Sequence, residues 1–264
     1  MSDDNETQIV QSNETQTKSP NKPKPARIIV LQRRDVDQTW SLVEIVTNRP
    51  PLGWKNLFAK LGPAVKHVEK QICNDNYVPL KADVFNAYHY TPLNKVKVVI
   101  IGQDPYYTVI NGKPQAMGLS FSCRKGTPIQ PSLKNIFIEL SNTIDNFEKP
   151  EHGDLTSWAK QGVFLLNTSL TTIEGLANAH EQVWFGVIQK TLKEIVENRP
   201  NTVVLLWGGK ADKVRPFLGN LKILSCPHPS PMSAHHGFFG CNHFNLANEY
   251  LVKKGETPIN WRLI

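Results

Sequence analysis

The sequence predicts an α/β fold: a single domain with a central four-stranded parallel sheet, helices flanking both faces of that sheet, and a disordered N-terminal tail. Two patterns support this. Four short apolar runs, several rich in β-branched residues, have the composition of strands that are buried on both faces. Stretches with apolar residues at helical spacing lie between these runs, as the crossovers of a parallel sheet require. With 264 residues, the chain is long enough for one large domain plus a tail.

The N-terminal part differs in composition from the rest. Residues 1–26 are rich in Asn, Thr, Gln, Ser, Lys and Pro. They cannot bury enough apolar surface to offset their ordering entropy, so we expect a disordered polar tail. The basic run from Lys18 to Arg27 is compatible with a nuclear address and also with a plain solvated linker. Residues 27–53 are expected to form an accessory arm, and residues 54–264 the main domain.

The main domain begins with apolar residues at helical spacing from Gly53 to Ile72, which Pro63 divides into two predicted short helices. The first strand, Val96–Ile101, is followed by a polar loop whose Asn111-Gly112 pair favours a turn. A short strand over residues 118–122 and a helix that Ser132 caps are predicted next. Three buried strands follow, over residues 163–166, 202–207 and 221–225. A helix is predicted after each of them: over residues 183–197, up to about Leu218, and over residues 242–253.

Charge and composition narrow the range of partners. The net charge of +7 and the pI of about 9.2 favour polyanions, nucleic acid first and a membrane surface second. The sequence has no run of about 18 apolar residues, so no transmembrane helix is expected. The adjacent pair His235-His236 has no metal-ligand spacing around it, and we expect no metal site. Without a Cys-x-x-Cys pair, the four cysteines are predicted to be free thiols in a reducing compartment: Cys73, Cys123, Cys226 and Cys241.

The residues that follow the four predicted strands are candidates for a site. Asp104 comes after the first strand, Asn167 after the second, Gly208-Gly209 after the third and His228 after the fourth. In open α/β sheets, ligands bind outside the carboxyl ends of the strands. Asp104-Pro105 on its own is more typical of a turn than of a catalytic acid. The four positions together favour a catalytic site.

This set of residues excludes several reaction types. It contains no Ser or Cys in a nucleophile elbow and lacks the paired carboxylates of ordinary sugar hydrolases. The sequence also has no Gly-x-Gly-x-x-Gly or P-loop motif, so no nucleotide cofactor is expected. One carboxylate, one imidazole and one amide suit a hydrolysis in which the leaving group is already a good one.

Six motifs, in the same order along residues 54–264, resemble those of the family-1 uracil-DNA glycosylases. They are Gly102-Gln103-Asp104-Pro105-Tyr106, His152-Gly153-Asp154-Leu155, Leu165-Leu166-Asn167, Leu205-Leu206-Trp207-Gly208, His228-Pro229-Ser230-Pro231 and Gly237-Phe238-Phe239-Gly240-Cys241. The resemblance implies a base-excision repair enzyme that flips uracil out of DNA and hydrolyses its N-glycosidic bond. It would release free uracil, leave an abasic site and use no metal or cofactor.

The resemblance also implies a role for each matching residue. Asp104 would position the attacking water at the sugar C1′ and stabilise the oxocarbenium-like sugar. His228, in its neutral form, would donate a hydrogen bond to uracil O2, which the backbone amides of Gln103 and Asp104 also face. Asn167 would read the edge of the base. The remaining contacts would be stacking by Phe121, exclusion of a 5-methyl group by Tyr106, phosphate contacts from Ser132, Gly208, Gly209 and Ser230, and a wedge at Met232 supported by His236.

The sequence departs from the family pattern near the site. Tyr107 stands where a His is usual, and the loop Thr108–Pro114 is longer than usual. Gly209 replaces a phosphate-binding Ser, Met232 replaces a Leu, and His236 replaces an Arg. Together, these changes would weaken binding to duplex DNA and leave the chemical residues in place.

Two alternative functions remain open from the sequence: a DNA-holding polymerase accessory subunit, and a hydrolase of free nucleosides. The intact set of Asp104, Asn167 and His228 argues against the first, and the basic charge argues against the second. The expected partners are single- and double-stranded DNA containing uracil, with no membrane partner and a monomeric state. A replication factor could bind the N-terminal tail. The expected location is intracellular, with the nucleus favoured over the cytoplasm.

Overall fold

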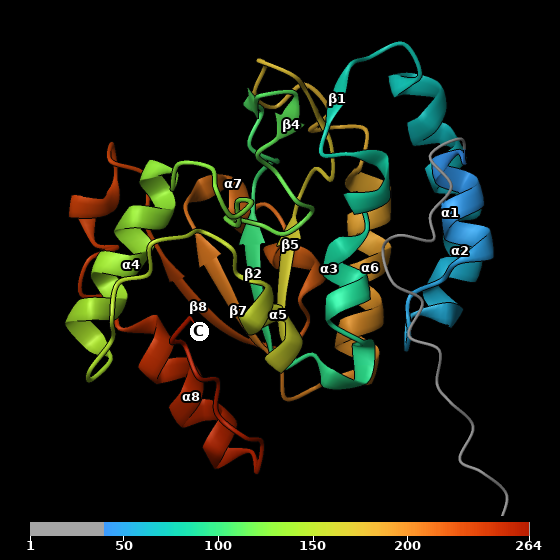
Figure 1. Cartoon of the computed structure of the whole chain (residues 1–264). Helices are drawn as coiled ribbons and strands as arrows, with labels where there is room; N and C mark the ends of the chain where they lie inside the picture. Colours follow the sequence, from blue (N-terminus) through green and yellow to red (C-terminus); the bar gives the residue numbers. More distant parts are fainter. Residues whose placement is uncertain (1–39, 264) are drawn as a thin grey trace, which may run out of the picture.

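The computed structural model describes residues 40–263. The predicted tail and the first part of the predicted arm, through residue 39, lie outside the described residues. A parallel sheet with the strand order β5-β2-β7-β8 forms the centre of the fold (Figure 1), which confirms the predicted architecture. The four strands are β2 Val98–Gly102, β5 Val163–Asn167, β7 Val203–Trp207 and β8 Lys222–Cys226.

The four strands of the sheet differ in burial. Every residue of β2, β5 and β7 is buried, as the apolar runs predicted. The fourth run was also predicted as a buried strand, and this is wrong. β8 is an edge strand with exposed residues at Lys222 and Ser225. The other edge strand, β5, stays buried because α3 and α5 pack against it.

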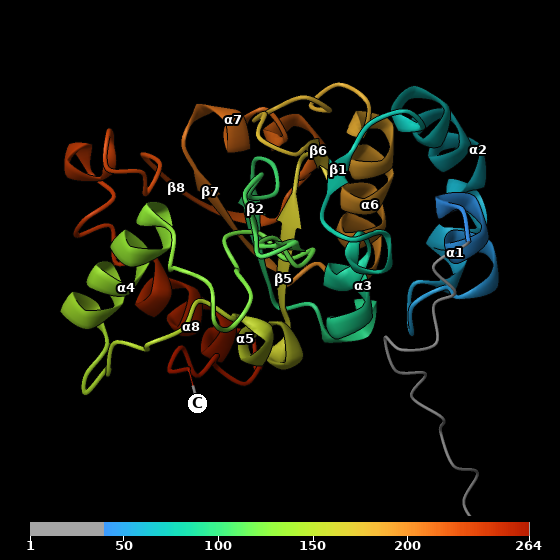
Figure 2. The same ribbon diagram turned by 45° about the horizontal axis from the view of Figure 1, so that its top comes forward.

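Helices cover both faces of the sheet (Figures 1 and 2). One group, α1, α2, α3 and α6, lies to the right in both views, and α4 and α8 lie to the left. The helices are α1 Leu42–Asn48, α2 Lys55–Ile72, α3 Asn86–Tyr90, α4 Pro131–Thr143, α5 Thr156–Gln161, α6 Phe185–Asn198, α7 Gly209–Asp212 and α8 His243–Lys253. Two small antiparallel pairs complete the fold, β1 Tyr77–Val78 with β6 Thr172–Ile173 and β3 Val109–Ile110 with β4 Lys113–Pro114. No helix in the described part of the chain is both long and apolar enough to cross a membrane.

Helix α2 is continuous through Pro63, so the prediction of two short helices is wrong. Proline removes one backbone hydrogen bond to the residue four positions earlier. That residue, Ala59, is exposed, so its carbonyl can bond water instead. The described part of the arm contributes α1, which begins with a capping box between Ser41 and Glu44. Its apolar face is buried with that of α2.

Three local predictions near the site have different outcomes. The Asn111-Gly112 turn is confirmed, and it joins β3 to β4. Residues 118–122 form bends and a turn and not the predicted strand, because Gly118 and Phe121 have left-handed φ values of 75° and 60°, which interrupt an extended backbone. Ser132 does not cap α4. The helix starts at Pro131, which has no N–H to satisfy, and Gln130 occupies the cap position.

Candidate active site

The carboxyl ends of the four parallel strands point to the same edge of the sheet, where the loops around β4 and α7 lie (Figure 1). At this edge β2 and β5 pair so that Gly102 lies opposite Asn167. Asn167 is only 6% exposed, and a Cβ atom on Gly102 would lie 2.2 Å from its Oδ1. The amide therefore rests directly against the glycine backbone, and the missing side chain of Gly102 makes room for it.

Asp104 is half-buried just beyond the end of β2. The backbone N–H of Asn178 donates to its Oδ2 at 2.7 Å. Burial raises the pKa of Asp104, while the bond from Asn178 and the positive charge of Lys210 act in the opposite direction. The site thus holds a partly desolvated carboxylate, which interacts more strongly with a developing positive charge than a hydrated one would.

His228 follows β8 and is also half-buried. Its Nδ1 accepts a hydrogen bond from the backbone N–H of Ser230 at 3.0 Å. Because an acceptor nitrogen carries no proton, the proton of the neutral ring lies on Nε2, which is free to donate. Burial lowers the pKa of His228 and so favours this neutral form. The backbone of His228 lies close to Gly208, where an added Cβ atom would lie 2.8 Å from the Cβ of His228.

Phe121 lies between the imidazole and the core. Its ring centroid is 5.9 Å from that of His228 and 5.5 Å from that of Trp207. Phe121 has a φ of 60°, a left-handed conformation that is costly for a bulky side chain. The hydroxyl of Tyr106 donates to the Phe121 carbonyl at 2.9 Å and helps to hold this conformation. Strain of this kind is concentrated at functional sites.

The predicted DNA-contacting residues lie on loops around this edge. Ser132 is in the first turn of α4, and Ser230 pairs its hydroxyl with that of Ser233 at 2.9 Å. Gly208 donates its N–H to the Cys226 carbonyl, so a phosphate contact at this loop would fall to Gly209 at the start of α7. Met232 is 89% exposed, and His236 is exposed in the adjoining short 3-10 helix Ala234–His236.

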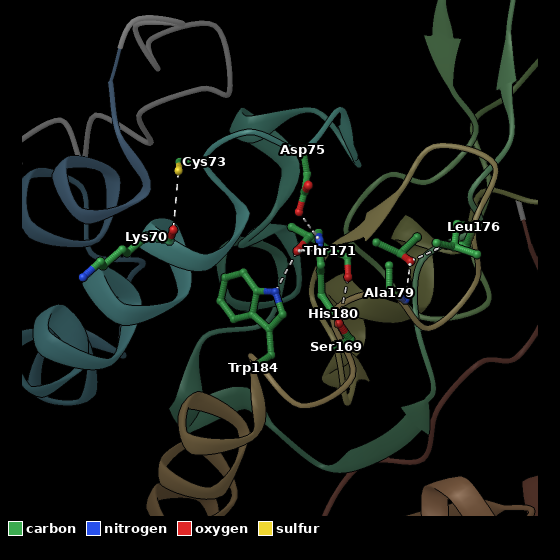
Figure 3. A network of polar contacts seen from close by, with 10 residues as sticks. Lys70, Cys73, Asp75, Ser169, Thr171, Leu176, Ala179, His180 and Trp184 are labelled. Carbon is green, nitrogen blue, oxygen red and sulfur yellow. Dashed lines mark hydrogen bonds and ion pairs between the residues drawn. The ribbon is translucent and has the colours of Figure 1, made fainter.

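The sequence did not indicate that the loop between β6 and α6, which carries Asn178, takes part in the site. A buried polar network fixes the base of this loop (Figure 3). His180 bonds Asp75 through Nε2 at 2.9 Å and Thr171 through Nδ1 at 2.8 Å, and Trp184 also donates to the Thr171 hydroxyl. Asn178 itself is 74 residues from Asp104 in sequence, and no local pattern indicates their contact.

The fold also brings together Cys226, Cys241 and His243, with one potential ligand atom from each within 4.8 Å of the others. Trp207 donates its Nε1–H to Nδ1 of His243 at 3.1 Å, so the proton of the neutral ring lies on Nε2. Neither ring nitrogen is then available to a metal, and this arrangement does not fit a metal ion. All four cysteines are free thiols, as predicted.

An open parallel sheet whose strand ends present a carboxylate, an amide and a neutral imidazole donor has the layout of a glycosylase that separates a base from its sugar. The sequence matches the Uracil DNA glycosylase superfamily over residues 88–252. The uracil-DNA glycosylases of Escherichia coli strain K12 and Shigella flexneri are each 51% identical to it over 186 residues, 69% of this chain and 80% of theirs.

Solved structures show the same relationship. Mimivirus uracil-DNA glycosylase matches with a TM-score of 0.75 and 29% identity, covering 84% of this chain and 89% of its own. A variant of the mimivirus protein in complex with UGI matches with a TM-score of 0.78 and 28% identity, covering 84% and 91%. The chain therefore belongs to the uracil-DNA glycosylase superfamily, as a family-1 enzyme. It is a base-excision repair hydrolase that acts on uracil in DNA.

Proposed function

We propose that this chain excises uracil from both single- and double-stranded DNA, with Asp104 and His228 as its catalytic residues and Asn167 reading the base. The geometry of His228 carries this proposal. The Ser230 N–H occupies Nδ1, so the ring offers an Nε2–H donor at the edge of the sheet that also holds Asp104 and Asn167. A donor there can stabilise a base that leaves as an anion.

The base must first leave the helix, which costs a few kcal/mol. Phe121 offers a ring on which the flipped base can stack, and stacking of a base on an aromatic ring offsets roughly 1–3 kcal/mol. Asn167, held against Gly102, presents one acceptor and one donor, which match the edge of uracil and mismatch that of cytosine. The Tyr106 hydroxyl donates to the Phe121 carbonyl, and this position beside the stacking ring supports a role for Tyr106 in excluding a 5-methyl group.

Bond cleavage then proceeds with the electrons of the C1′–N1 bond moving onto the base. The oxocarbenium-like sugar that develops is stabilised by the negative charge of Asp104. The base anion is stabilised at O2 by the neutral His228 donor. A water molecule oriented by Asp104 adds its oxygen to C1′ and loses a proton through Asp104 to solvent, and the uracil anion takes up a proton from solvent, so the products are free uracil and an abasic site. Both protein groups act most strongly in the transition state, where charge has separated.

The proposal also includes the action on duplex DNA, the location of the protein, its contact with a replication factor and its monomeric state. Exposed Met232 next to the His228 loop supports action on duplexes, because an apolar side chain can fill the gap a flipped base leaves. The basic run Lys18–Arg27 supports a nuclear location, and a polar tail supports contact with a replication factor. We propose a monomer, since one chain contains all of the site residues.

The experiment measures uracil release from a uracil-containing single-stranded oligonucleotide, the matched duplex, and free deoxyuridine. Release from both oligonucleotides and not from deoxyuridine is expected. Asp104→Asn should lower the single-turnover rate by about a hundredfold or more with DNA affinity nearly unchanged. A variant within about threefold of the parent, under one kcal/mol on the transition-state scale, would show that Asp104 is only a turn residue. DNA binding without any release would favour an accessory subunit, and release from deoxyuridine would favour a nucleoside hydrolase.

A further inference from the structure

Lys210 lies outside the predicted site, at the second position of α7, and its side chain is 44% exposed. We infer that Lys210 is a positioning residue for Asp104: it holds Asn178 in the conformation that delivers a backbone N–H to the catalytic carboxylate, and it places a positive charge beside that carboxylate. This inference rests on the proposed role of Asp104.

Two consecutive hydrogen bonds connect Lys210 to the carboxylate. Lys210 Nζ donates to Asn178 Oδ1 at 2.9 Å, and the Asn178 N–H donates to Asp104 Oδ2 at 2.7 Å. Asn178 has a φ of 62°, in the left-handed region that Asn tolerates better than most residues. The side chain of Asn178 thus binds Lys210 while its backbone N–H binds Asp104. Because both contacts belong to one residue, a shift of the first changes the geometry of the second.

The rest of this loop is fixed without Lys210. The Ala179 N–H donates to the Thr172 hydroxyl at 3.2 Å, and the same hydroxyl donates to the Leu176 carbonyl at 2.7 Å (Figure 3). His180, which is 3% exposed, is held by Asp75 and Thr171. Removing the Lys210 side chain should therefore leave the loop folded, and the effect should be confined to Asn178 and to the charge near Asp104.

The groups around Asp104 determine how the loss of Lys210 should change its pKa. Burial raises the pKa of Asp104, and the Asn178 N–H and Lys210 lower it, while Glu181 raises it slightly. Glu181 is itself bonded by Lys213 at 2.6 Å and paired with Lys210 at 3.5 Å, so its charge is largely compensated. Because only the ionised carboxylate stabilises the sugar cation, loss of Lys210 should remove activity first on the acidic side of the pH profile.

Lys213 supplies a matched control. It is a lysine on the same surface and binds the same Glu181, with a side chain that is 60% exposed. Among the described contacts, its bond goes to Glu181, whereas Lys210 also reaches Asn178. Replacing either lysine by Met removes one positive charge near the DNA-binding edge, so both variants should lose DNA affinity to a similar extent. Only Lys210→Met should remove the contact to Asn178, whereas Lys213→Met can act on Asp104 only through the charge of Glu181, which Lys210 still partly compensates.

The experiment measures single-turnover uracil release from a saturating single-stranded oligonucleotide between about pH 5 and pH 9 for the parent, Lys210→Met, Lys210→Arg and Lys213→Met. For Lys210→Met, the acidic limb should move up by about half a pH unit, and the rate near neutral pH should fall about fivefold. Lys210→Arg should keep most of the parent rate, because the charge and a donor remain. Lys213→Met should move the limb much less than Lys210→Met does.

Equal acidic limbs for Lys210→Met and Lys213→Met would overturn the inference, as would a loss confined to DNA affinity, which would make Lys210 a phosphate contact only. Thermal unfolding of each variant confirms that the proteins compared are folded. A parent that releases no uracil would instead overturn the proposed role of Asp104, so the two failures are distinct.

Discussion

Replacing Gly102 by Ala tests how closely Asn167 must be held. Gly102 does not have a positive φ, so alanine meets no backbone penalty and the perturbation is purely steric. The added Cβ would lie 2.2 Å from Asn167 Oδ1 and 2.6 Å from the Cβ of buried Ser120. The Ser120 atom cannot retreat easily, because its N–H is bonded to β5 and its hydroxyl to β2. The amide of Asn167 must therefore move away from the base.

In its proposed role Asn167 makes two hydrogen bonds to uracil, worth together about 2–3 kcal/mol, so their loss should lower the single-turnover rate roughly 30- to 150-fold. Crowding at Ser120 should also cost about 1–3 kcal/mol of stability, which lowers the melting temperature by a few degrees. The assay measures uracil release and thermal unfolding for the parent, Gly102→Ala and a control, Gly186→Ala. Gly186 lies in α6 with no atom within 4 Å of an added Cβ. Parent-like release by Gly102→Ala would refute the claim that the glycine sets the position of the amide.

Two further variants test base reading and duplex opening. Asn167→Asp should allow release of cytosine, because a protonated carboxyl can donate and accept where the amide pattern excluded this base. Failure to detect cytosine release from oligonucleotides, with uracil release unchanged, would show that Asn167 does not read the edge. Met232→Ala should lower release from duplex DNA much more than from single strands, since only a duplex has a stack to hold open, and Met232→Leu should keep or improve duplex activity. Matched oligonucleotides measure the difference, and equal losses on both would exclude a wedge.

The parts of the fold that depend on local composition could be predicted from the sequence. Strands β2, β5 and β7 are buried on both faces, so their apolar runs stand out from the surrounding sequence. The edge position of β8 could not be predicted, because it depends on strand order and not on the strand itself. Pro63 was read as a helix break because the sequence does not show that Ala59 faces water.

The site also contains residues that the sequence predicts and contacts that it does not. Asp104, Asn167 and His228 could be placed at one edge because the carboxyl ends of parallel strands meet there. The hydrogen bonds around Asp104 could not be predicted, because they join segments that are distant in sequence. Asn178 is 74 residues from Asp104, and Lys210 is 32 residues from Asn178. The left-handed backbone conformation of Phe121 could not be predicted either. Phenylalanine rarely adopts it, and tertiary contacts such as the hydrogen bond from the Tyr106 hydroxyl hold it in place.

In the loop after β8, one residue connects the proposed DNA-phosphate contact to the orientation of the proposed leaving-group donor, His228. The Ser230 N–H fixes the His228 ring, the Ser230 hydroxyl pairs with Ser233, and the Ser233 hydroxyl donates to the His228 carbonyl at 2.8 Å. With the proposed roles of these residues, a phosphate would accept the hydrogen bond of the Ser230 hydroxyl in place of Ser233, while the Ser230 N–H still fixes Nδ1 of His228. Binding energy from the phosphate would thereby contribute to the orientation of the Nε2–H donor at the base. Oligonucleotides too short to reach this loop should consequently react more slowly even when they saturate the enzyme.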